Sequence, residues 1–141
     1  YQSINRIWNK AKNIPYPLRK MASDILLTGL GKAKSDRRTK AFLLGAINDP
    51  KAIPALIETM HDNNKLVRRE ASTAVSRMGE PAVDPLIETL EDEDWRVRGA
   101  AAWALGNLGD EKAIPALEKL LDDESGFVKQ GAQSAINSIN K

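Results

Sequence analysis

The chain has 141 residues and a formal net charge of +2, with 21 Lys and Arg residues against 19 Asp and Glu residues. It contains no cysteine, which excludes disulfide bonds and thiolate metal sites and is compatible with a reducing cytosol, so we expect a cytoplasmic location. No apolar run approaches the roughly 20 residues that a membrane-spanning helix needs, so we expect no membrane span.

Residues 1–34 lie in the most basic part of the chain and are predicted to hold two helices. Residues 1–40 contain ten Lys or Arg against two acidic residues, whereas residues 41–141 contain eleven against seventeen. Apolar residues recur at helical spacing over residues 3–12 and again over residues 17–30. Pro15 and Pro17 separate these two predicted helices, because proline disfavours helical geometry in the residue that precedes it.

From about residue 35 to the end of the sequence, a unit of 30 to 31 residues recurs. Two sets of equivalent positions each carry one residue type, namely Val67, Val97 and Val128, and Ala71, Ala101 and Ala132. Each full unit has a short first helix, which opens near an acidic residue or a proline, and a longer second helix. The predicted caps of the second helices are Asn64, Asp94 and Ser125 at the N-termini, and Gly79 and Gly109 at the C-termini.

A single helical hairpin cannot bury its apolar face alone, so this period predicts an all-α solenoid of stacked helical hairpins over residues 35–141. Residues 36–49 align with residues 97–110 and form an earlier half-unit. We interpret residues 1–34 as an atypical N-terminal cap that covers the open apolar end of the array. The alternative is that these basic amphipathic helices bind an anionic membrane surface or nucleic-acid phosphates.

One stretch carries the clearest repeat motif: Asp92, Asp94, Val97 and Arg98, followed by Ala101, Ala104, Leu105, Gly106, Leu108, Gly109 and Asp110. This motif resembles the HEAT-like repeat of the phycobilisome-lyase type, and residues 62–139 are especially similar to small HEAT-like proteins of methanogenic archaea. The resemblance implies a scaffold in which the basic residue after the repeated valine pairs with acidic groups of a loop. In this sequence that residue is Arg68, Arg98 or, in the last copy, Lys129. The partners expected from this resemblance are Asp62, Asp92 and Asp123.

Residues suited to catalysis are sparse in this sequence. The one histidine, His61, falls at the end of a first helix beside Asp62, where we favour a solvated or capping role over a catalytic relay. The acidic runs 91–94 and 122–124 are interpreted as caps and solvated charge, with a weak divalent-cation site as the alternative. Iron-binding HEAT enzymes that resemble deoxyhypusine hydroxylase have several His-Glu pairs, and this sequence has none. We therefore predict that the chain is not an enzyme and has no catalytic residue, metal or cofactor.

The second helices are predicted to line one continuous surface, which in solenoids is commonly the concave binding face. Phe42 and Trp103 occupy one position of the repeat on that surface, and Trp95 lies near the start of its helix. Exposed aromatic residues beside Arg are typical of binding hot spots, whereas the alternative is that these rings pack on neighbouring units. The predicted partner-binding residues are Arg38, Phe42, Arg69, Thr73, Arg77, Trp95, Gly99, Trp103, Asn107, Gln130 and Ser134.

These observations lead to three functional hypotheses. The first is a non-enzymatic scaffold that binds a protein partner through the concave face of the solenoid. The second is binding of nucleic acid or an anionic surface through residues 6–40, because this segment carries most of the excess positive charge. The third is a lyase or chaperone role towards a tetrapyrrole, which only the resemblance to phycobilisome lyases implies.

Overall fold

The computed structural model describes residues 15, 17, 18, 20, 22 and 34–141. The predicted helix over residues 3–12 lies outside the described residues, as does most of the one over residues 17–30. The chain divides into two compact units, Tyr1–Met78 and Gly79–Lys141, which we name the first unit and the second unit. The predicted boundary between an N-terminal cap and the repeat array, at residues 34 and 35, stays a prediction, because residues 23–33 are not described.

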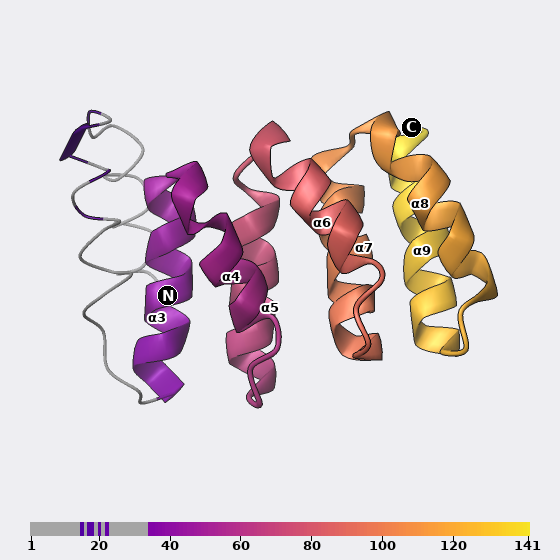
Figure 1. Ribbon diagram of the computed structural model, residues 1–141, viewed down its shortest axis with the longest axis horizontal. Helices are drawn as coiled ribbons and strands as arrows, with labels where there is room; N and C mark the ends of the chain where they lie inside the picture. The colour runs from indigo at the N-terminus through magenta and orange to yellow at the C-terminus, as the bar shows by residue number, and fades with distance from the viewer. Residues whose placement is uncertain (1–14, 16, 19, 21, 23–33) are drawn as a thin grey trace. The chain divides into compact units, whose positions relative to one another are not determined.

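From residue 34 on, the first unit is a helix followed by one helical hairpin (Figure 1). Helix α3 spans Lys34–Ile47 and packs against α5, which spans Lys65–Ser76. Between them lie a 3₁₀ turn, η1 (Pro50–Ala52), and the short helix α4 (Ile53–Thr59), which packs on α5. The buried stripe of α5 consists of Val67, Ala71, Ser72, Ala74 and Val75.

The second unit consists of two consecutive hairpins. The first hairpin comprises the 3₁₀ turn η2 (Glu80–Ala82) and the helices α6 (Val83–Thr89) and α7 (Trp95–Leu108). The second comprises η3 (Glu111–Ala113), α8 (Ile114–Lys119), η4 (Leu120–Asp122) and α9 (Gly126–Ile139). Helices α7 and α9 pack side by side, with each short first helix on its own second helix. The described residues hold no strand, and the predicted all-α stack of hairpins is confirmed within each unit.

The predicted N-caps form as expected, and one predicted C-cap differs. Asn64 accepts hydrogen bonds from the amides of the first turn of α5, and Asp94 and Ser125 do the same for α7 and α9. Gly109 ends α7 in the left-handed conformation, with φ 73° and ψ 15°. Gly79 also has a positive φ of 75°, but its ψ of −153° is extended, because this residue leads into η2 instead of closing α5.

Two glycines at one position of the repeat let second helices approach each other closely. A Cβ atom on Gly45 of α3 would lie 2.6 Å from Ala74 Cβ, and one on Gly106 of α7 would lie 3.0 Å from Ala135 Cα. These distances are shorter than ordinary van der Waals contacts, so a larger side chain at either position would push the helices apart. The glycine of the repeat motif is therefore a packing residue.

Ion pairs between a second helix and the next loop recur in both units at the same spacing. Arg37 donates to Asp62 from Nε at 2.7 Å and from Nη2 at 3.1 Å, and Arg98 donates to Asp123 at 2.9 and 3.0 Å. The expected role of Asp123 is confirmed, because it pairs with Arg98. Asp62 pairs instead with Arg37, the equivalent of Arg98 in the half-unit, while Arg68 donates to the Asp62 and Asn63 carbonyls.

Candidate functional site

In the first unit, the predicted aromatic contact residue is part of the packed interior. Phe42 is only 5% exposed and packs with Ala46 and Leu43. The guanidinium carbon of Arg77 lies 5.8 Å from the centroid of its ring, within the range of a cation–π contact. The expectation that Phe42 is exposed for binding is therefore wrong. The reason is the close approach of α3 to α5 at Gly45, one turn further along the helix.

Some of the polar residues predicted for binding on the first unit take part in contacts within the fold. Arg38 Nε lies 3.8 Å from Glu70 Oε2. Burial raises the pKa of the Glu70 carboxyl above its ordinary value, although Arg38 and Arg77 oppose this shift. Thr73 donates its hydroxyl to the Arg69 carbonyl at 2.9 Å, and Arg69 itself is exposed. Arg38 and Thr73 are therefore engaged in the fold, whereas the Arg69 side chain is exposed.

In the second unit, three large aromatic side chains are exposed on the two packed helices α7 and α9. Trp95 and Trp103 are each 47% exposed on α7, and Phe127 at the start of α9 is 60% exposed. The rings of Trp95 and Phe127 meet edge to face, with centroids 5.5 Å apart and planes at 78°. We name Trp95, Trp103 and Phe127 the aromatic patch.

Gly99 shows how the aromatic patch is assembled. It lies on α7 one turn after Trp95 and one turn before Trp103, and a Cβ atom there would come within 2.6 Å of Phe127 Cε1. The ring of Phe127 therefore lies against the backbone of Gly99 and buries it. The prediction that Gly99 contacts a partner is wrong for this reason, since Phe127 covers it.

Sequence reasoning missed Phe127. The residue stands at the position of the repeat that Leu66 and Arg96 occupy in the earlier copies, immediately before the buried valine. A signal was present in the sequence, because a glycine at position 99 of the preceding second helix leaves room for a large ring from the next one. The remaining predicted residues of this unit, Asn107, Gln130 and Ser134, are exposed on α7 and α9.

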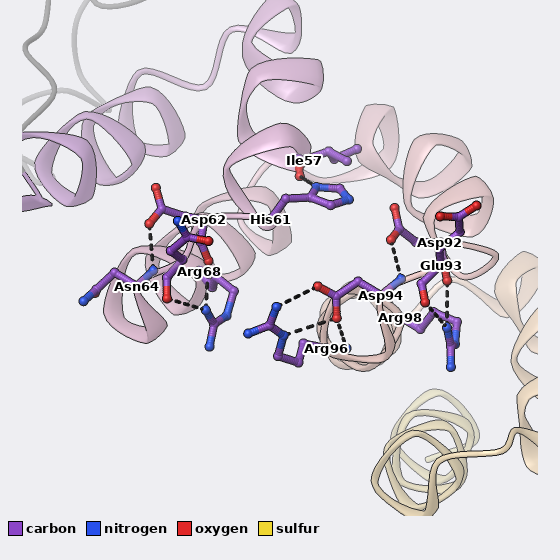
Figure 2. Close-up of polar contacts among 11 residues, drawn as sticks. Ile57, His61, Asp62, Asn64, Arg68, Asp92, Glu93, Asp94, Arg96 and Arg98 are labelled. Carbon is purple, nitrogen blue, oxygen red and sulfur yellow. Dashed lines mark hydrogen bonds and ion pairs between the residues drawn. The ribbon is translucent and has the colours of Figure 1, made fainter.

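The loops that precede α7 and α9 surround the start of both helices with negative charge. Residues 91–94 and 122–124 are all acidic. Arg96 pairs with Asp94 at 3.0 Å, and Arg98 donates hydrogen bonds to the Asp92 and Glu93 carbonyls, as Figure 2 shows. The hydrogen bonds from Arg98 hold the pKa of Asp123 below its ordinary value, against the opposing effect of burial.

His61 lies apart from the aromatic patch, at the end of α4 in the first unit. Its ring is exposed, with Nδ1 3.3 Å from the Ile57 carbonyl (Figure 2). It lines a groove of about 620 Å³ together with Lys40, Glu58 and Asp62. Among the residues that the structure describes, no group of three or more His, Cys, Asp or Glu is arranged to hold a metal ion. Within the same residues, no helix is long and apolar enough to cross a bilayer.

Comparison with known proteins identifies the repeat. HEAT repeats match residues 23–88 and 81–137. Human deoxyhypusine hydroxylase in complex with glycerol superposes with a TM-score of 0.69 and 25% identity, covering 86% of this chain and 43% of that one. The CpcE–CpcF complex of phycocyanin lyase from Nostoc gives a TM-score of 0.59 and 28% identity, over 90% of this chain and 54% of that one. A designed armadillo repeat protein with a bound peptide shares the fold, with a TM-score of 0.51 and 19% identity over 84% of this chain and 62% of that one.

A protein found by sequence similarity is also a deoxyhypusine hydroxylase. Deoxyhypusine hydroxylase from Rattus norvegicus is 42% identical over 45 residues, which is 30% of this chain and 15% of the relative. The chain therefore spans less than two thirds of each of these proteins. These matches contradict the sequence-based prediction that the chain is not an enzyme, because a sequence relative and a similar structure are both deoxyhypusine hydroxylases.

Proposed function

The chain belongs to the family of HEAT repeat proteins, and we propose that it is a scaffold that binds a protein partner through the aromatic patch of its second unit. The observation that carries this proposal is the exposure of three aromatic rings on two packed helices, two of which contact each other. Trp is among the residues most enriched in binding hot spots, since it contributes a large contact area at a small cost in side-chain entropy.

Two of the three rings of the aromatic patch, Trp95 and Phe127, are already held in place before a partner arrives. Trp95 and Phe127 contact each other edge to face, and Phe127 rests on the backbone of Gly99. A preorganised surface binds more tightly than a mobile one, because less conformational entropy is lost on association. The alternative in which aromatic rings serve only packing applies to Phe42, whereas Trp95 and Trp103 each keep 47% of their surface exposed.

The proposal is tested with variants that remove the patch and keep the fold. Trp103→Ala combined with Phe127→Ala removes two exposed rings, and Leu66→Ala is the matched control because Leu66 is 41% exposed at the position equivalent to Phe127. A partner captured by the wild-type protein from a cell extract should be retained by the control and lost by the double variant. Far-ultraviolet circular dichroism should show equal helix content in all three. Retention of the same partner by the double variant would refute the proposed site.

An enzymatic or lyase role is the second candidate, and the similarity to deoxyhypusine hydroxylase and phycocyanin lyase favours it. The groove beside His61 would be its location, because it brings a histidine, carboxylates and Lys40 to one place. A bilin added to the protein should then change its absorption spectrum, and His61→Ala should abolish the change. An unaltered spectrum would dispose of the lyase role. The predicted binding of nucleic acid through residues 6–40 stays a prediction, because most of that segment is not described.

A further inference from the structure

We infer that the aromatic patch binds an extended protein segment rich in Lys and Arg, an inference that rests on the proposed function and specifies its partner. The inference combines two features of the second unit. One is the shape and length of the aromatic patch, and the other is the negative charge of the loops beside it.

The length of the patch fits a short extended segment. Trp95 and Trp103 are eight residues apart on α7, which corresponds to about 12 Å along the helix axis. An extended chain advances roughly 3.3 to 3.6 Å per residue, so about four residues of a partner would span this distance. Every second side chain of such a segment points the same way, which places two side chains about 7 Å apart against the rings.

Indole and phenyl rings bind cationic side chains well. The flat faces of Trp and Phe attract ammonium and guanidinium groups through the ring quadrupole, and Trp does so most strongly. The aliphatic stems of Lys and Arg also bury well against apolar surface while their charged ends stay in water. The aromatic patch therefore suits basic side chains as well as purely apolar ones, and the surrounding charge decides between them.

That charge is negative. Residues 79–141 contain thirteen Asp or Glu and six Lys or Arg. Three cations lie near the start of α7 and α9 in the sequence. Arg96 pairs with Asp94 and Arg98 with Asp123, so their charges are already balanced, and Lys129 is the third. The acidic side chains of Glu93 and Glu124 are exposed in the loops that lead into Trp95 and Phe127. They would attract a basic segment and repel phosphate groups of nucleic acids or anionic lipids.

Uncharged polar groups beside the rings complete the surface. Asn107 is exposed one turn after Trp103, and Gln130 and Ser134 are exposed on α9 beyond Phe127. Amide side chains both donate and accept hydrogen bonds, so they can pair with the main-chain N–H and C=O groups of an extended segment. The surface thus offers ring contacts to side chains, carboxylates to their charges and amides to the backbone.

The first experiment is selection from a library of random peptides displayed on phage, with the full chain as bait and the Trp103→Ala/Phe127→Ala variant for removal of unspecific binders. Enrichment of sequences with several Lys or Arg supports the inference. Enrichment of peptides without basic residues would overturn it and leave the proposed docking site standing. Failure of any peptide to prefer the wild type over the variant would overturn both.

The second experiment measures affinity by fluorescence anisotropy with labelled peptides of about ten residues, the length needed to span the patch with flanking contacts. One peptide alternates Arg with Ala, and the other has Gln in place of Arg. The Arg peptide should bind at least about tenfold more tightly at low salt, and this preference should shrink as salt rises. The Trp103→Ala/Phe127→Ala variant should lose about thirtyfold or more in affinity for it. Equal affinities for the two peptides would overturn the inference.

The contribution of the loops is isolated by charge variants. Glu93→Gln with Glu124→Gln should weaken binding of the Arg peptide about tenfold at low salt, because each exposed carboxylate near a bound cation contributes about a threefold factor. Glu88→Gln with Glu118→Gln changes the net charge equally but on the first helices α6 and α8, and it should have a much smaller effect. Equal effects of the two double variants would show that only overall charge matters and would overturn the assigned site. Tighter binding of a single-stranded oligonucleotide than of the Arg peptide would also overturn it, if the Trp103→Ala/Phe127→Ala variant lost that binding.

Discussion

Substitution of Arg98 by Met should destabilise the protein far more than the same change at Arg96, two residues earlier on α7. Arg98 is 16% exposed and makes four hydrogen bonds. Two run to the carboxylate of Asp123 at 2.9 and 3.0 Å, and two run from Nη1 to the Asp92 and Glu93 carbonyls at 2.8 and 3.0 Å. Arg96 is 44% exposed, and its guanidinium pairs with Asp94.

The size of the effect follows from what the Met variant leaves behind. Asp123, 9% exposed, would lose both guanidinium hydrogen bonds and keep the one from the Ser125 amide. Breaking a buried ion pair on one side costs about 3 to 5 kcal/mol, and an exposed pair contributes about 0 to 1 kcal/mol. The Arg98 pair lies between these limits, so we expect a loss of about 2 to 3 kcal/mol in the free energy of unfolding. For Arg96→Met we expect a much smaller loss, because solvent screens an exposed ion pair.

Urea unfolding followed by circular dichroism at neutral pH measures both values. The pH dependence gives a second check, because the pair lowers the pKa of Asp123 in the folded state. A carboxyl with a depressed folded pKa stabilises the fold above its unfolded pKa and loses this effect as pH falls through the folded value. The difference between wild type and Arg98→Met should therefore shrink below about pH 4. Equal costs for the two Met variants would refute the reasoning.

Three further predictions follow from the packing and charge of the repeats. Gly45→Ala should destabilise the protein by about 1 to 3 kcal/mol in urea unfolding, since the new Cβ would lie 2.6 Å from Ala74 Cβ. A Cβ at Gly131 on α9 would meet open space, so Gly131→Ala should stabilise the protein by about 0.5 to 1 kcal/mol in the same assay. Gly109→Ala should lower stability by about 1 kcal/mol, because φ is 73° there, and an unchanged midpoint would contradict the cap assignment. Glu70→Gln should raise the stability of the fold at neutral pH, because a carboxyl whose pKa is raised on folding destabilises the fold as it ionises. This advantage should disappear below about pH 4, where the wild-type carboxyl is protonated in both states. A variant less stable than the wild type at neutral pH would contradict this.

The repeat made most of the architecture predictable from sequence. Valine and alanine at fixed spacing place the buried stripe of every second helix, and Asn64, Asp94 and Ser125 mark where those helices begin. These features are predictable because they depend on residues close together in the sequence. Capping and helical periodicity are local properties of the chain.

The surface was harder to predict because it depends on contacts between helices. Phe42 and Trp103 occupy one position of the repeat, yet one ring is buried beneath Arg77 and the other is half exposed. Phe127 and Gly99 lie 28 positions apart in the sequence, and only the packing of α9 on α7 brings them together. Equivalence in a repeat therefore predicts backbone position well and side-chain exposure poorly.

The prediction about enzymatic activity failed for a different reason. It rested on counting histidines and His-Glu pairs, whereas the similarity to deoxyhypusine hydroxylase lies in the repeat as a whole. A scaffold fold carries many functions, so the absence of one residue pattern does not exclude the chemistry of a relative.

The most direct test of the docking surface is two-dimensional NMR of the tryptophan indole N–H groups during titration with the Arg peptide. Single Trp→Phe variants assign the signals of Trp8, Trp95 and Trp103. Shifts that saturate together for the Trp95 and Trp103 signals are the predicted result. A titration in which the peptide binds while both α7 indole signals stay in place, or in which no signal moves at any peptide concentration, would contradict the assignment of the aromatic patch as the docking surface.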